Sequence, residues 1–488
     1  MAVDRPQNPP VQSDARPTGA TFADLGVPRS LCDVLDADGI TSPFPIQTAT
    51  LPDSIAGRDV LGRGRTGSGK TLAFVLPMLT RLSAGRTERR PGKPRALILA
   101  PTRELVNQIQ DSILPLAEPL GLRTITVFGG VAPGPQINGL KRGVDIVVAC
   151  PGRLEDHLRS RHVDLGSVEI TVLDEADHMA DLGFLPVVKR LLDTTPRSAQ
   201  RLLFSATLDN GIDVLVKRYL TDPITHSVDS AQAAVGTMEH HVLHVTASDR
   251  LPVLVDLVST EDRTMVFTRT KHRAKQLTRQ LISAGVPSVE MHGNLAQNAR
   301  SRNLAAFADG RATVLVATDI AARGIHVDDV TLVVHADPPI EHKAYLHRSG
   351  RTARAGAEGT VVTLATEEQR RDVQQLARKA GISPTVTQVR PGHPLLTELA
   401  PGERVRRDAD EIAKALSVGV RTHQPAGTGK HRRRNPSRGP GGPKAAQGAR
   451  SGGGQRSGGG SGGQRSGGGA RPGGGAPGGG PRRRARRP

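Results

Sequence analysis

Most of the eight short apolar runs in this chain pass directly into polar clusters, and this arrangement constrains the fold more than any other feature. Helix-like patterns separate the runs along the chain. Alternation of short strands with helices is typical of parallel α/β sheets. We therefore expect an α/β protein whose strands include Ala96–Ala100, Asp145–Ala149, Thr171–Leu173, Arg201–Phe204, Thr264–Phe267, Thr313–Ala317, Leu332–His335 and Thr360–Leu364.

The runs form two sets of four, separated by the small and polar stretch Asp222–Gly236. A chain of 488 residues is long enough for two or three domains. We expect one α/β domain over residues 21–228, a linker over 229–237, a second domain over 238–384 and a C-terminal extension over 385–426. Ligands of open parallel sheets bind at the carboxyl ends of the strands. The polar clusters therefore predict an active site in a cleft where the two sheet edges face each other.

Residues 427–488 differ in composition from the rest of the chain, because they contain no Val, Ile, Leu, Met, Phe or Tyr. Such a segment cannot bury enough apolar surface to offset chain entropy, so we expect it to be disordered, like the polar and Pro-rich residues 1–20. Residues 421–488 hold 16 Lys and Arg and no acidic residue, which leaves only +3 of the net charge of +19 for the remainder. This asymmetry favours a nucleic acid held by salt-sensitive phosphate contacts. A solubilising linker is the alternative.

Cysteine content and hydropathy limit the expected location. Cys32 and Cys150 are the only cysteines and lie far apart in sequence, so neither a disulfide framework nor a Cys-type zinc site is implied. The N-terminal residues lack the apolar core of a signal peptide, and no run approaches the roughly 18 apolar residues of a membrane span. We expect a cytoplasmic protein that has no membrane partner.

The sequence GRTGSGKT fits the phosphate-loop pattern G-x-x-x-x-G-K-T. It follows the apolar run DVL and precedes the helical pattern LAFVLPML, which is the context such a loop requires. Lys70 would reach the β and γ phosphates of a nucleotide, and the Thr71 hydroxyl would bind Mg²⁺. A Gly-rich turn that caps a helix is the alternative. The predicted nucleotide contacts are Gly64, Arg65, Thr66, Gly67, Ser68, Gly69, Lys70 and Thr71.

The stretch ITVLDEADHMADL places three carboxylates at the end of an apolar run. Buried charges of this kind must be paired, solvated or bound to a cation. A phosphate loop needs a carboxylate on a second strand to hold its metal ion, and Asp174 fits that role. Glu175 would orient or deprotonate the attacking water. Alone, the acidic stretch could be a solvated turn, but with the phosphate loop it predicts hydrolysis of a nucleoside triphosphate.

The stretch YLHRSGRTARAG could place positive charge on the transferring phosphoryl group. Arg351 and Arg354 are spaced i and i+3, so we expect them on one face of a helix. Their location in the second domain would make hydrolysis depend on closure of the cleft. A basic surface turn is the alternative.

In these motifs and their order, the chain resembles the DEAD-box ATP-dependent RNA helicases of superfamily 2, from about Thr21 to Pro384. The resemblance implies two tandem RecA-like domains that face each other across an ATP and RNA cleft, with ATP and Mg²⁺ as cofactors and RNA as the partner. The matching motifs are Phe22 with SPFPIQ ending at Gln47, GRTGSGKT, PTREL, Gly129–Gly130, PGR, DEAD, SAT, VFTRT, HGNLAQNAR, ATDIAARG and HRSGRTAR.

The resemblance also implies residue roles. Phe22 would stack on adenine, and Gln47 would form a hydrogen bond with it. Asp177 would contact Ser205 and Thr207 and couple the nucleotide state to RNA binding. Hydrolysis would depend on Lys70, Asp174, Glu175, Arg351 and Arg354. RNA phosphates would be held, with little sequence specificity, by Thr102, Arg103, Gly130, Gly152, Arg153, Arg269, Gly293, Arg300 and Thr318.

Three residues depart from the family pattern. Cys150 stands where the family has Thr before PGR, so a hydroxyl donor towards phosphate is lost. His326 stands where the family has an Asp that contacts the ATP ribose, so this contact would depend on an imidazole. Ala353 stands where the family has Gly, and we expect its methyl group to be tolerated.

We expect an RNA-dependent ATPase that locally unwinds or remodels RNA duplexes and RNA–protein complexes. One alternative is a DNA helicase built on the same core. Another is an RNA chaperone whose basic tail does the work while its ATPase has decayed. Ribosome assembly, RNA decay and cold adaptation all fit, so ribosomal or degradation-machinery partners are expected, and the oligomeric state is left open.

Overall fold

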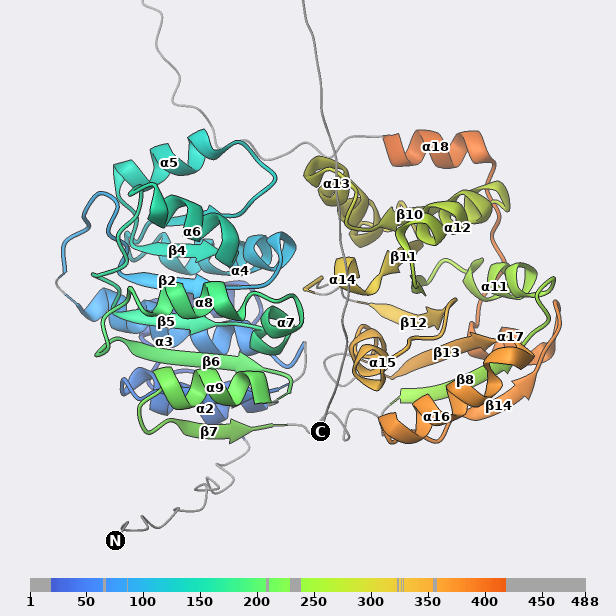
Figure 1. The fold of residues 1–488 in the computed structure, drawn as a ribbon, viewed down its shortest axis with the longest axis horizontal. Helices are drawn as coiled ribbons and strands as arrows, with labels where there is room; N and C mark the ends of the chain where they lie inside the picture. The colour runs from blue at the N-terminus through green and yellow to red at the C-terminus, as the bar shows by residue number, and fades with distance from the viewer. Residues whose placement is uncertain are drawn as a thin grey trace, which may run out of the picture. The chain divides into compact units, whose positions relative to one another are not determined.

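Two seven-stranded sheets organise the computed structural model, and every pair of neighbouring strands within them is parallel (Figure 1). The structure describes residues 19–417 except 65–66, 86, 208–209, 229–237, 323, 326, 328 and 354–357. The predicted linker and basic tail, with the start of the N-terminal segment and the end of the C-terminal extension, lie outside the described residues.

The first sheet has the strand order β3-β4-β2-β5-β6-β1-β7. Its strands are β1 (Val60–Arg63), β2 (Ala96–Leu99), β3 (Thr124–Val127), β4 (Ile146–Ala149), β5 (Ile170–Leu173), β6 (Gln200–Ser205) and β7 (Ile224–Ser227). The helices of this domain are α1 (Arg29–Ala37), α2 (Pro45–Ile55), α3 (Lys70–Ala84), α4 (Arg103–Ala117), α5 (Pro133–Arg142), α6 (Pro151–Arg159), α7 (Ala176–Asp181), α8 (Leu185–Leu192) and α9 (Asn210–Tyr219).

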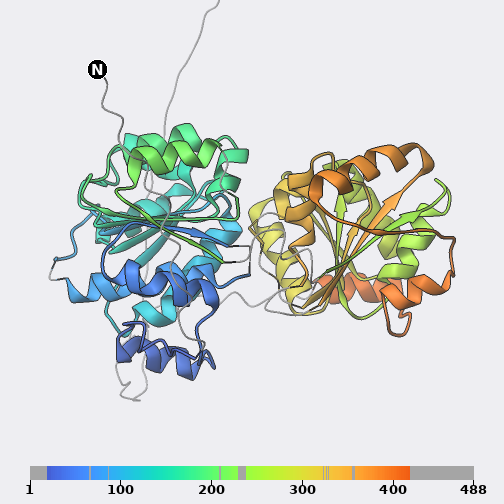
Figure 2. The same cartoon turned by 90° about the horizontal axis from the view of Figure 1, so that it is seen from below.

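Helices cover both faces of the first sheet (Figure 2). Successive residues of each strand point to opposite faces, so apolar side chains on both faces need a covering layer. In β2, Ile98 packs in a cluster with side chains of α1 to α4. Its neighbours Leu97 and Leu99 pack in a second cluster with side chains of α5 to α9. Two buried faces explain why the inner strands β2 and β4 are apolar throughout instead of alternating with polar residues.

The second sheet repeats this plan with the order β10-β11-β9-β12-β13-β8-β14. Its strands are β8 (Met238–His244), β9 (Arg263–Thr268), β10 (Ser288–Met291), β11 (Val314–Thr318), β12 (Val330–His335), β13 (Gly359–Ala365) and β14 (Thr385–Gln388). Its helices are α11 (Arg250–Val258), α12 (Lys271–Ser283), α13 (Gln297–Ala308), α14 (Asp319–Ala322), α15 (His342–Ser349), α16 (Arg370–Ala380), α17 (Pro394–Leu399) and α18 (Ala409–Ser417), with the 3₁₀ turn η1 (Glu367–Gln369) before α16.

All eight strands expected from the sequence are present, seven of them within one residue at each end and β12 beginning two residues earlier than expected. Two other segments differ from expectation. The stretch Asp222–Gly236 begins with β7, which pairs with β1 at the edge of the first sheet. The second sheet continues past 384, because β14 pairs with β8 and α17 packs into the core beside α11. These edge strands were missed because they are short and polar, and only their pairing makes them strands.

Site-bearing helices begin directly at the carboxyl ends of strands. The Thr102 hydroxyl accepts a hydrogen bond from the Leu105 N–H at the start of α4. The Thr270 hydroxyl does the same for the Arg273 N–H at the start of α12. Each threonine satisfies one backbone donor of a helix end. No helix in the described part of the chain is both long enough and apolar enough to span a membrane.

Candidate active site

The phosphate loop lies at the end of β1 and leads into α3. The Lys70 ammonium donates to the Gly64 carbonyl over 2.6 Å and is buried. The Gly64 N–H donates to the Ser205 carbonyl over 3.1 Å, which ties the loop to the end of β6. Thr71 follows Lys70 in the first turn of α3. Arg65 and Thr66 lie outside the described residues.

Gln47 contacts the phosphate loop directly. Its amide oxygen accepts from the Phe44 N–H, and its amide nitrogen donates to the Gly69 carbonyl over 2.9 Å. Gly69 has φ +86°, and a methyl group there would lie 2.6 Å from the Gln47 nitrogen. A larger residue is therefore excluded at Gly69 both by backbone conformation and by space.

Phe22 is 3% exposed and packs in the apolar cluster beside α1 to α4. Its ring therefore presents little surface to a ligand in this structure. Stacking of Phe22 on adenine stays a prediction, as does the hydrogen bond from Gln47 to the base.

The acidic residues after β5 are buried and crowded. Asp174 is 3% exposed and accepts the Glu175 N–H over 2.9 Å. Burial raises the pKa of the Asp174 carboxyl to about 7, and the Lys70 ammonium opposes this rise. Burial would also raise the pKa of Glu175, but the hydrogen bond and charge of His178, with Arg351 and Lys70, lower it to about 2. Glu175 is therefore a carboxylate at neutral pH, within 3.2 Å of His178 Nδ1.

Asp177 lies against the SAT segment, as the resemblance implies. Its carboxylate accepts from the Thr207 N–H over 2.9 Å and from the Thr207 hydroxyl over 3.0 Å. Its own N–H donates to the Ser205 hydroxyl. The three residues therefore form one hydrogen-bonded unit between β6 and α7, and coupling of nucleotide to RNA through this unit stays a prediction.

The residues expected to hold Mg²⁺ have suitable donor atoms. Asp174 offers a buried carboxylate and Thr71 a hydroxyl, which are the hard oxygen ligands that Mg²⁺ prefers. The neighbouring carboxylates of Glu175 and Asp177 raise the pKa of Asp174 further, so added positive charge suits this position. The described residues contain no group of three His, Cys, Asp or Glu side chains able to hold a metal by themselves. Mg²⁺ commonly uses one or two protein ligands, with phosphate oxygens and water as the others.

Arg351 of the second domain lines the same pocket as the groups of the first. This pocket is bounded by Lys70, Glu175, Asp177, His178, Ala206, His347 and Arg351. Arg351 is 5% exposed, and its guanidinium donates to the Ile325 and His347 carbonyls.

The single helix face expected for Arg351 and Arg354 does not exist. Helix α15 ends at Ser349 with Gly350 as its C-cap, so Arg351 lies in the turn beyond it. Arg354 lies outside the described residues, as does His326. The i,i+3 spacing indicates a shared face only where a helix continues, and this helix ends before Arg351.

Arg348, in the same motif, holds the second domain together. It is 2% exposed and forms two hydrogen bonds with Asp319 at the start of α14, and its Nη1 donates to the Asp337 carbonyl over 2.8 Å. The guanidinium also lies 5.2 Å from the centre of the Phe267 ring. The sequence analysis named Arg351 and Arg354 of this motif for the reaction and assigned no role to Arg348.

Predicted RNA contacts of the first domain gather around the two glycines after β3. The Arg103 guanidinium lies so close to Gly130 that a methyl group there would be 2.1 Å from its Nη1. Arg153, at the start of α6, donates to the Val131 carbonyl over 3.2 Å. Gly152 has open space where a side chain would be. Thr102 caps α4, so its hydroxyl already serves the protein backbone.

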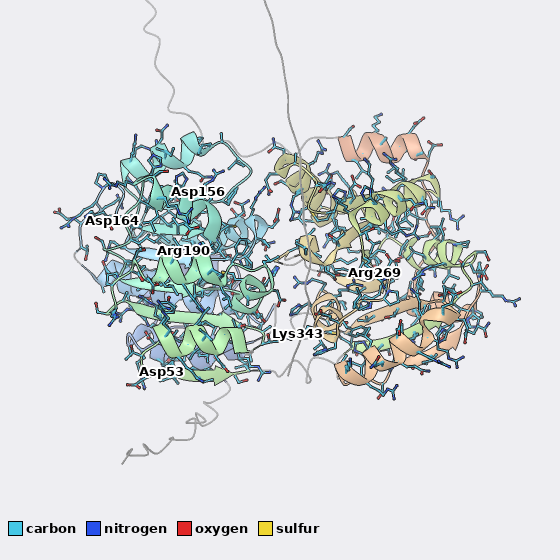
Figure 3. All side chains as sticks on the ribbon, in the orientation of Figure 1. Asp53, Asp156, Asp164, Arg190, Arg269 and Lys343 are labelled. Carbon is cyan, nitrogen blue, oxygen red and sulfur yellow. The ribbon has the colours of Figure 1, made fainter. Side chains whose placement is uncertain are left out.

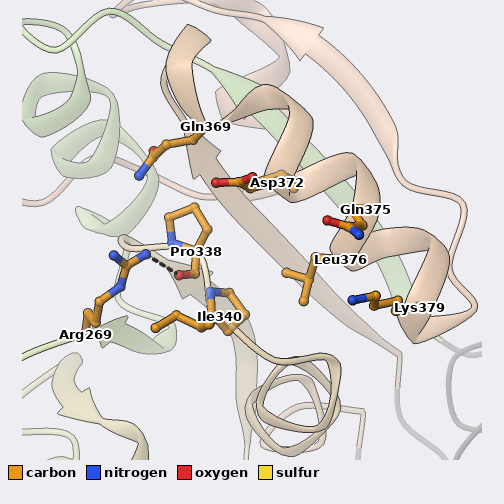
Figure 4. Close-up of a pocket in the computed structure, with 10 residues that line it drawn as sticks. Arg269, Pro338, Ile340, Gln369, Asp372, Gln375, Leu376 and Lys379 are labelled. Carbon is orange, nitrogen blue, oxygen red and sulfur yellow. Dashed lines mark hydrogen bonds between the residues drawn. The ribbon is translucent and has the colours of Figure 1, made fainter. Parts of the chain in front are cut away.

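Predicted RNA contacts of the second domain lie at strand ends. Arg269 follows β9, and its guanidinium donates to the Pro338 carbonyl at the edge of a cavity of about 350 Å³ (Figures 3 and 4). Thr318 ends β11 and is half-buried. Gly293 follows β10, with open space where a side chain would be. These positions are compatible with backbone contacts to a nucleic acid, which stay predictions.

Arg300 has a protein partner that the sequence analysis missed. Its Nε donates to Glu104 over 2.8 Å, and the Gln297 amide nitrogen donates to the same carboxylate oxygen over 3.0 Å. Arg103 donates to the Gln297 amide oxygen over 3.0 Å. Glu104 is 6% exposed. Four side chains from PTREL and from α13 therefore join the two domains, although nearly 200 residues separate them in sequence.

Glu104→Ala is expected to weaken this junction strongly. Removing one partner of a buried charged pair costs about 2–5 kcal/mol, because the other charge stays without its partner. The RNA concentration for half-maximal ATPase stimulation should rise at least about 30-fold if closure accompanies RNA binding. Glu118→Ala, at the exposed end of the same helix α4, is the matched control. Equal RNA dependence of the two variants would contradict a role for Glu104 in closure.

A buried cluster of histidine and aromatic side chains packs between α15 and the second sheet. His240 Nδ1 lies 2.8 Å from the Tyr345 hydroxyl, and His335 Nδ1 lies 3.0 Å from the Thr363 hydroxyl. The His335 and Tyr345 rings meet edge to face at 4.9 Å. Burial lowers the pKa of His240 to about 4 and that of His335 well below its usual range. Both imidazoles are therefore neutral in the folded domain at neutral pH.

The second domain is expected to lose stability as the pH falls below about 6.5. The unfolded histidines bind protons there, whereas the folded ones do not, so the free energy of unfolding falls with pH until the folded pKa is reached. For His240 the loss between pH 7 and 5 is about 2 kcal/mol. Urea unfolding followed by Tyr345 fluorescence in a Tyr219→Phe background measures it. His240→Gln should reduce this loss of stability. His272→Gln, at an exposed position of α12, should not reduce it. Equal losses of stability in all variants would contradict the role of His240.

Two of the residues that depart from the family pattern, Cys150 and Ala353, are described by the structure. Cys150 precedes α6, is 9% exposed and makes no side-chain cap. Burial raises the pKa of its thiol to about 12, so it is neither an anion nor a reactive thiolate at neutral pH. Ala353 has φ +52° and is buried. The left-handed conformation costs Ala about 1–2 kcal/mol, which burial of its methyl group offsets by about 0.8 kcal/mol.

Two family models match this chain. The model described as DEAD/DEAH box helicase matches residues 44–214, and the model described as Helicase conserved C-terminal domain matches residues 248–356. The ATP-dependent RNA helicase RhlB of Pseudomonas syringae pv. tomato is 37% identical over 367 residues, which are 74% of this chain and 92% of that protein. The chain belongs to the DEAD-box ATP-dependent RNA helicase family.

Other members of the family are longer. The chloroplastic DEAD-box ATP-dependent RNA helicase 3A of Zea mays is 41% identical over 368 residues, which are 74% of this chain and 49% of that protein. The chain thus spans about half the length of the first curated relatives that it matches.

Solved structures of the family share the two-sheet architecture. Dbp5 of S. cerevisiae, bound to RNA and ADP BeF3, is 26% identical with a TM-score of 0.68, covering 81% of this chain and 99% of that one. Mss116p, bound to ssRNA and AMP-PNP, is 25% identical with a TM-score of 0.67, covering 79% of this chain and 83% of that one. The tandem RecA-like fold expected from the sequence is confirmed.

Proposed function

We propose that this chain is an RNA-dependent ATPase that uses ATP to separate or remodel short RNA duplexes and RNA–protein complexes. The pocket that joins Lys70 and Glu175 of one domain to Arg351 of the other carries the proposal. A group for phosphate, a carboxylate for water and a cation for transition-state charge meet there, as phosphoryl transfer requires. Arg351 comes from the second domain, so hydrolysis depends on contact between the domains.

RNA binding is supported by the residues at the strand ends of both domains. Arg103 and Arg300 already form the interdomain junction with Gln297 and Glu104, so RNA bound beside them would favour the closed arrangement. The proposed contacts are to phosphates and glycine backbone, so affinity should depend little on sequence and strongly on salt. The relatives Dbp5 and Mss116p were solved with RNA and an ATP analogue or ADP BeF3, which supports the same ligands here.

Mg²⁺ is proposed as the metal ion, held by Asp174 and Thr71. When bound, it would neutralise charge on the β and γ phosphates. Lys70 orients the phosphates from the loop, and Glu175 orients the attacking water. Composition and family membership support a cytoplasmic location and partners of the ribosomal or RNA-degradation type. Co-sedimentation with ribosomal subunits at two salt concentrations tests the ribosomal partner.

Comparison of ATP hydrolysis without polymer, with single-stranded RNA and with single-stranded DNA tests the proposal. Stimulation by RNA and not by DNA is the expected result. Equal or greater stimulation by DNA would favour a DNA helicase on the same core. Absence of hydrolysis in all three conditions would overturn the proposal and favour an RNA chaperone that acts through the basic tail.

A further inference from the structure

The two proposed RNA-binding segments of the first domain are joined by a buried chain of hydrogen bonds that the reaction does not use. One segment is the loop Phe128–Ala132, called here the GG loop, which contains Gly129–Gly130 and leads into α5. The other is the start of α6, with Gly152 and Arg153. Both follow strands of the first sheet, because β3 ends before the GG loop and β4 ends before α6.

Gln136 on α5 holds the start of the GG loop. Its amide nitrogen donates to the Phe128 carbonyl over 3.0 Å, and Gln136 is 6% exposed. On the other side of the two glycines, Arg153 donates to the Val131 carbonyl over 3.2 Å. The glycines, of which Gly130 has φ +78°, are thus fixed at both flanks by side chains. Without such bonds, a loop with two adjacent glycines has wide conformational freedom.

His157 on α6 holds Gln136 in turn. Its Nε2 lies 3.1 Å from the Gln136 amide oxygen, and His157 is 3% exposed. Since the amide nitrogen faces the Phe128 carbonyl, the amide oxygen must accept, so His157 Nε2 carries the proton. His157 Nδ1 is then the acceptor, and it lies 3.4 Å from His162 Nδ1, which would donate. Burial and the neighbouring His162 and Arg153 lower the pKa of His157, which agrees with this neutral form.

A second set of contacts keeps α6 in place from the opposite side. Arg190 on α8 donates to Glu155 over 2.6 Å, and Figure 3 shows it beside the helix that carries Asp156. Helix α6 is therefore a fixed support, and the His157–Gln136 pair transmits its position to the GG loop. The same helix presents Gly152 and Arg153 at its first turn.

We propose that Gln136 and His157 are positioning residues for RNA binding, which hold the GG loop at a fixed position relative to the start of α6. The inference rests on the proposed function, because it assigns these residues to the RNA site of that reaction. Neither side chain reaches the phosphate loop or the pocket that contains Lys70 and Arg351. Substitution of either residue should therefore weaken RNA binding and leave the KM for ATP unchanged.

The test uses the full-length Gln136→Leu, His157→Leu and His157→Gln variants. We measure the RNA concentration for half-maximal stimulation, the kcat at saturating RNA and the KM for ATP. Loss of one net hydrogen bond that orders a binding loop should raise the RNA concentration about 2- to 12-fold for both leucine variants. The kcat and the KM for ATP should stay within about twofold. His157→Gln keeps a side-chain N–H near Gln136 and should recover most of the RNA affinity.

Gln200→Leu is the matched control. Gln200 is also buried in the first domain, where its amide nitrogen donates to the Ser54 and Arg58 carbonyls, far from the GG loop. It should lower the melting temperature as Gln136→Leu does, without a change in RNA affinity. If Gln136→Leu does not fold, the pair His157→Leu and His157→Gln decides by itself.

Three results would overturn the inference. The first is an unchanged RNA affinity in folded leucine variants. The second is a rise in the KM for ATP as large as the rise in the RNA concentration for half-maximal stimulation, and the third is an RNA affinity of His157→Gln equal to that of His157→Leu. A wild-type protein without RNA stimulation would instead reject the proposed function, so the two failures are distinguishable.

Discussion

Arg351→Ala is expected to lower the kcat of RNA-stimulated ATP hydrolysis by about 10³- to 10⁵-fold. Arg351 comes from the second domain and lines one pocket with Lys70 and Glu175 of the first. The Ile325 and His347 carbonyls accept hydrogen bonds from its guanidinium, which fixes the plane of the group before any nucleotide binds. A preorganised cation stabilises charge that develops in the transition state and needs no reorganisation at that moment.

The Arg351 prediction has a sharp set of controls. Arg351→Lys should recover little activity, because an ammonium cannot keep both carbonyl contacts and a planar face to the phosphate. Arg370→Ala, an exposed arginine of the same domain, should leave kcat unchanged. Single-turnover hydrolysis and titration with a fluorescent ATP analogue separate chemistry from binding. A loss of kcat smaller than about tenfold would show that Arg351 only fills the pocket.

Glu175→Gln is expected to lower kcat by about 10²- to 10⁴-fold while ATP and RNA still bind. Glu175 has φ +48° at the end of β5, which turns its side chain into the pocket beside His178. Its pKa of about 2 makes it a weak base, so we expect it to act mainly by orienting the attacking water. Glutamine keeps the shape but replaces one acceptor oxygen by a donor and removes the charge.

The Glu175 prediction is checked by hydrolysis together with nucleotide-dependent retention of RNA. The variant should keep RNA bound in ATP for longer than wild type does if hydrolysis triggers release. Glu169→Gln, a half-exposed carboxylate paired with Arg95 in the same domain, is the matched control. Hydrolysis within about threefold of wild type would mean that another group orients the water.

Much of the site could be predicted from local sequence. The phosphate loop, the DEAD segment and SAT each place their groups within a few residues of a strand end, so a strand followed by a polar cluster suffices to locate them. The contacts of Asp177 with Thr207 link two such segments, and they were expected from the family resemblance. The structural role of Arg348 could not be predicted in this way, because its partners Asp319 and Asp337 lie in other segments of the chain.

The sequence by itself determined the parallel α/β plan of both domains, since apolar runs of strand length and phosphate-binding glycines are local features. Tertiary structure alone decided the Glu104–Arg300 junction, the Gln136–His157 pair and the edge strands β7 and β14. These features join residues that are distant in sequence, or depend on a neighbouring strand. Contacts between distant residues produce no local sequence pattern, because either partner alone is an ordinary polar residue.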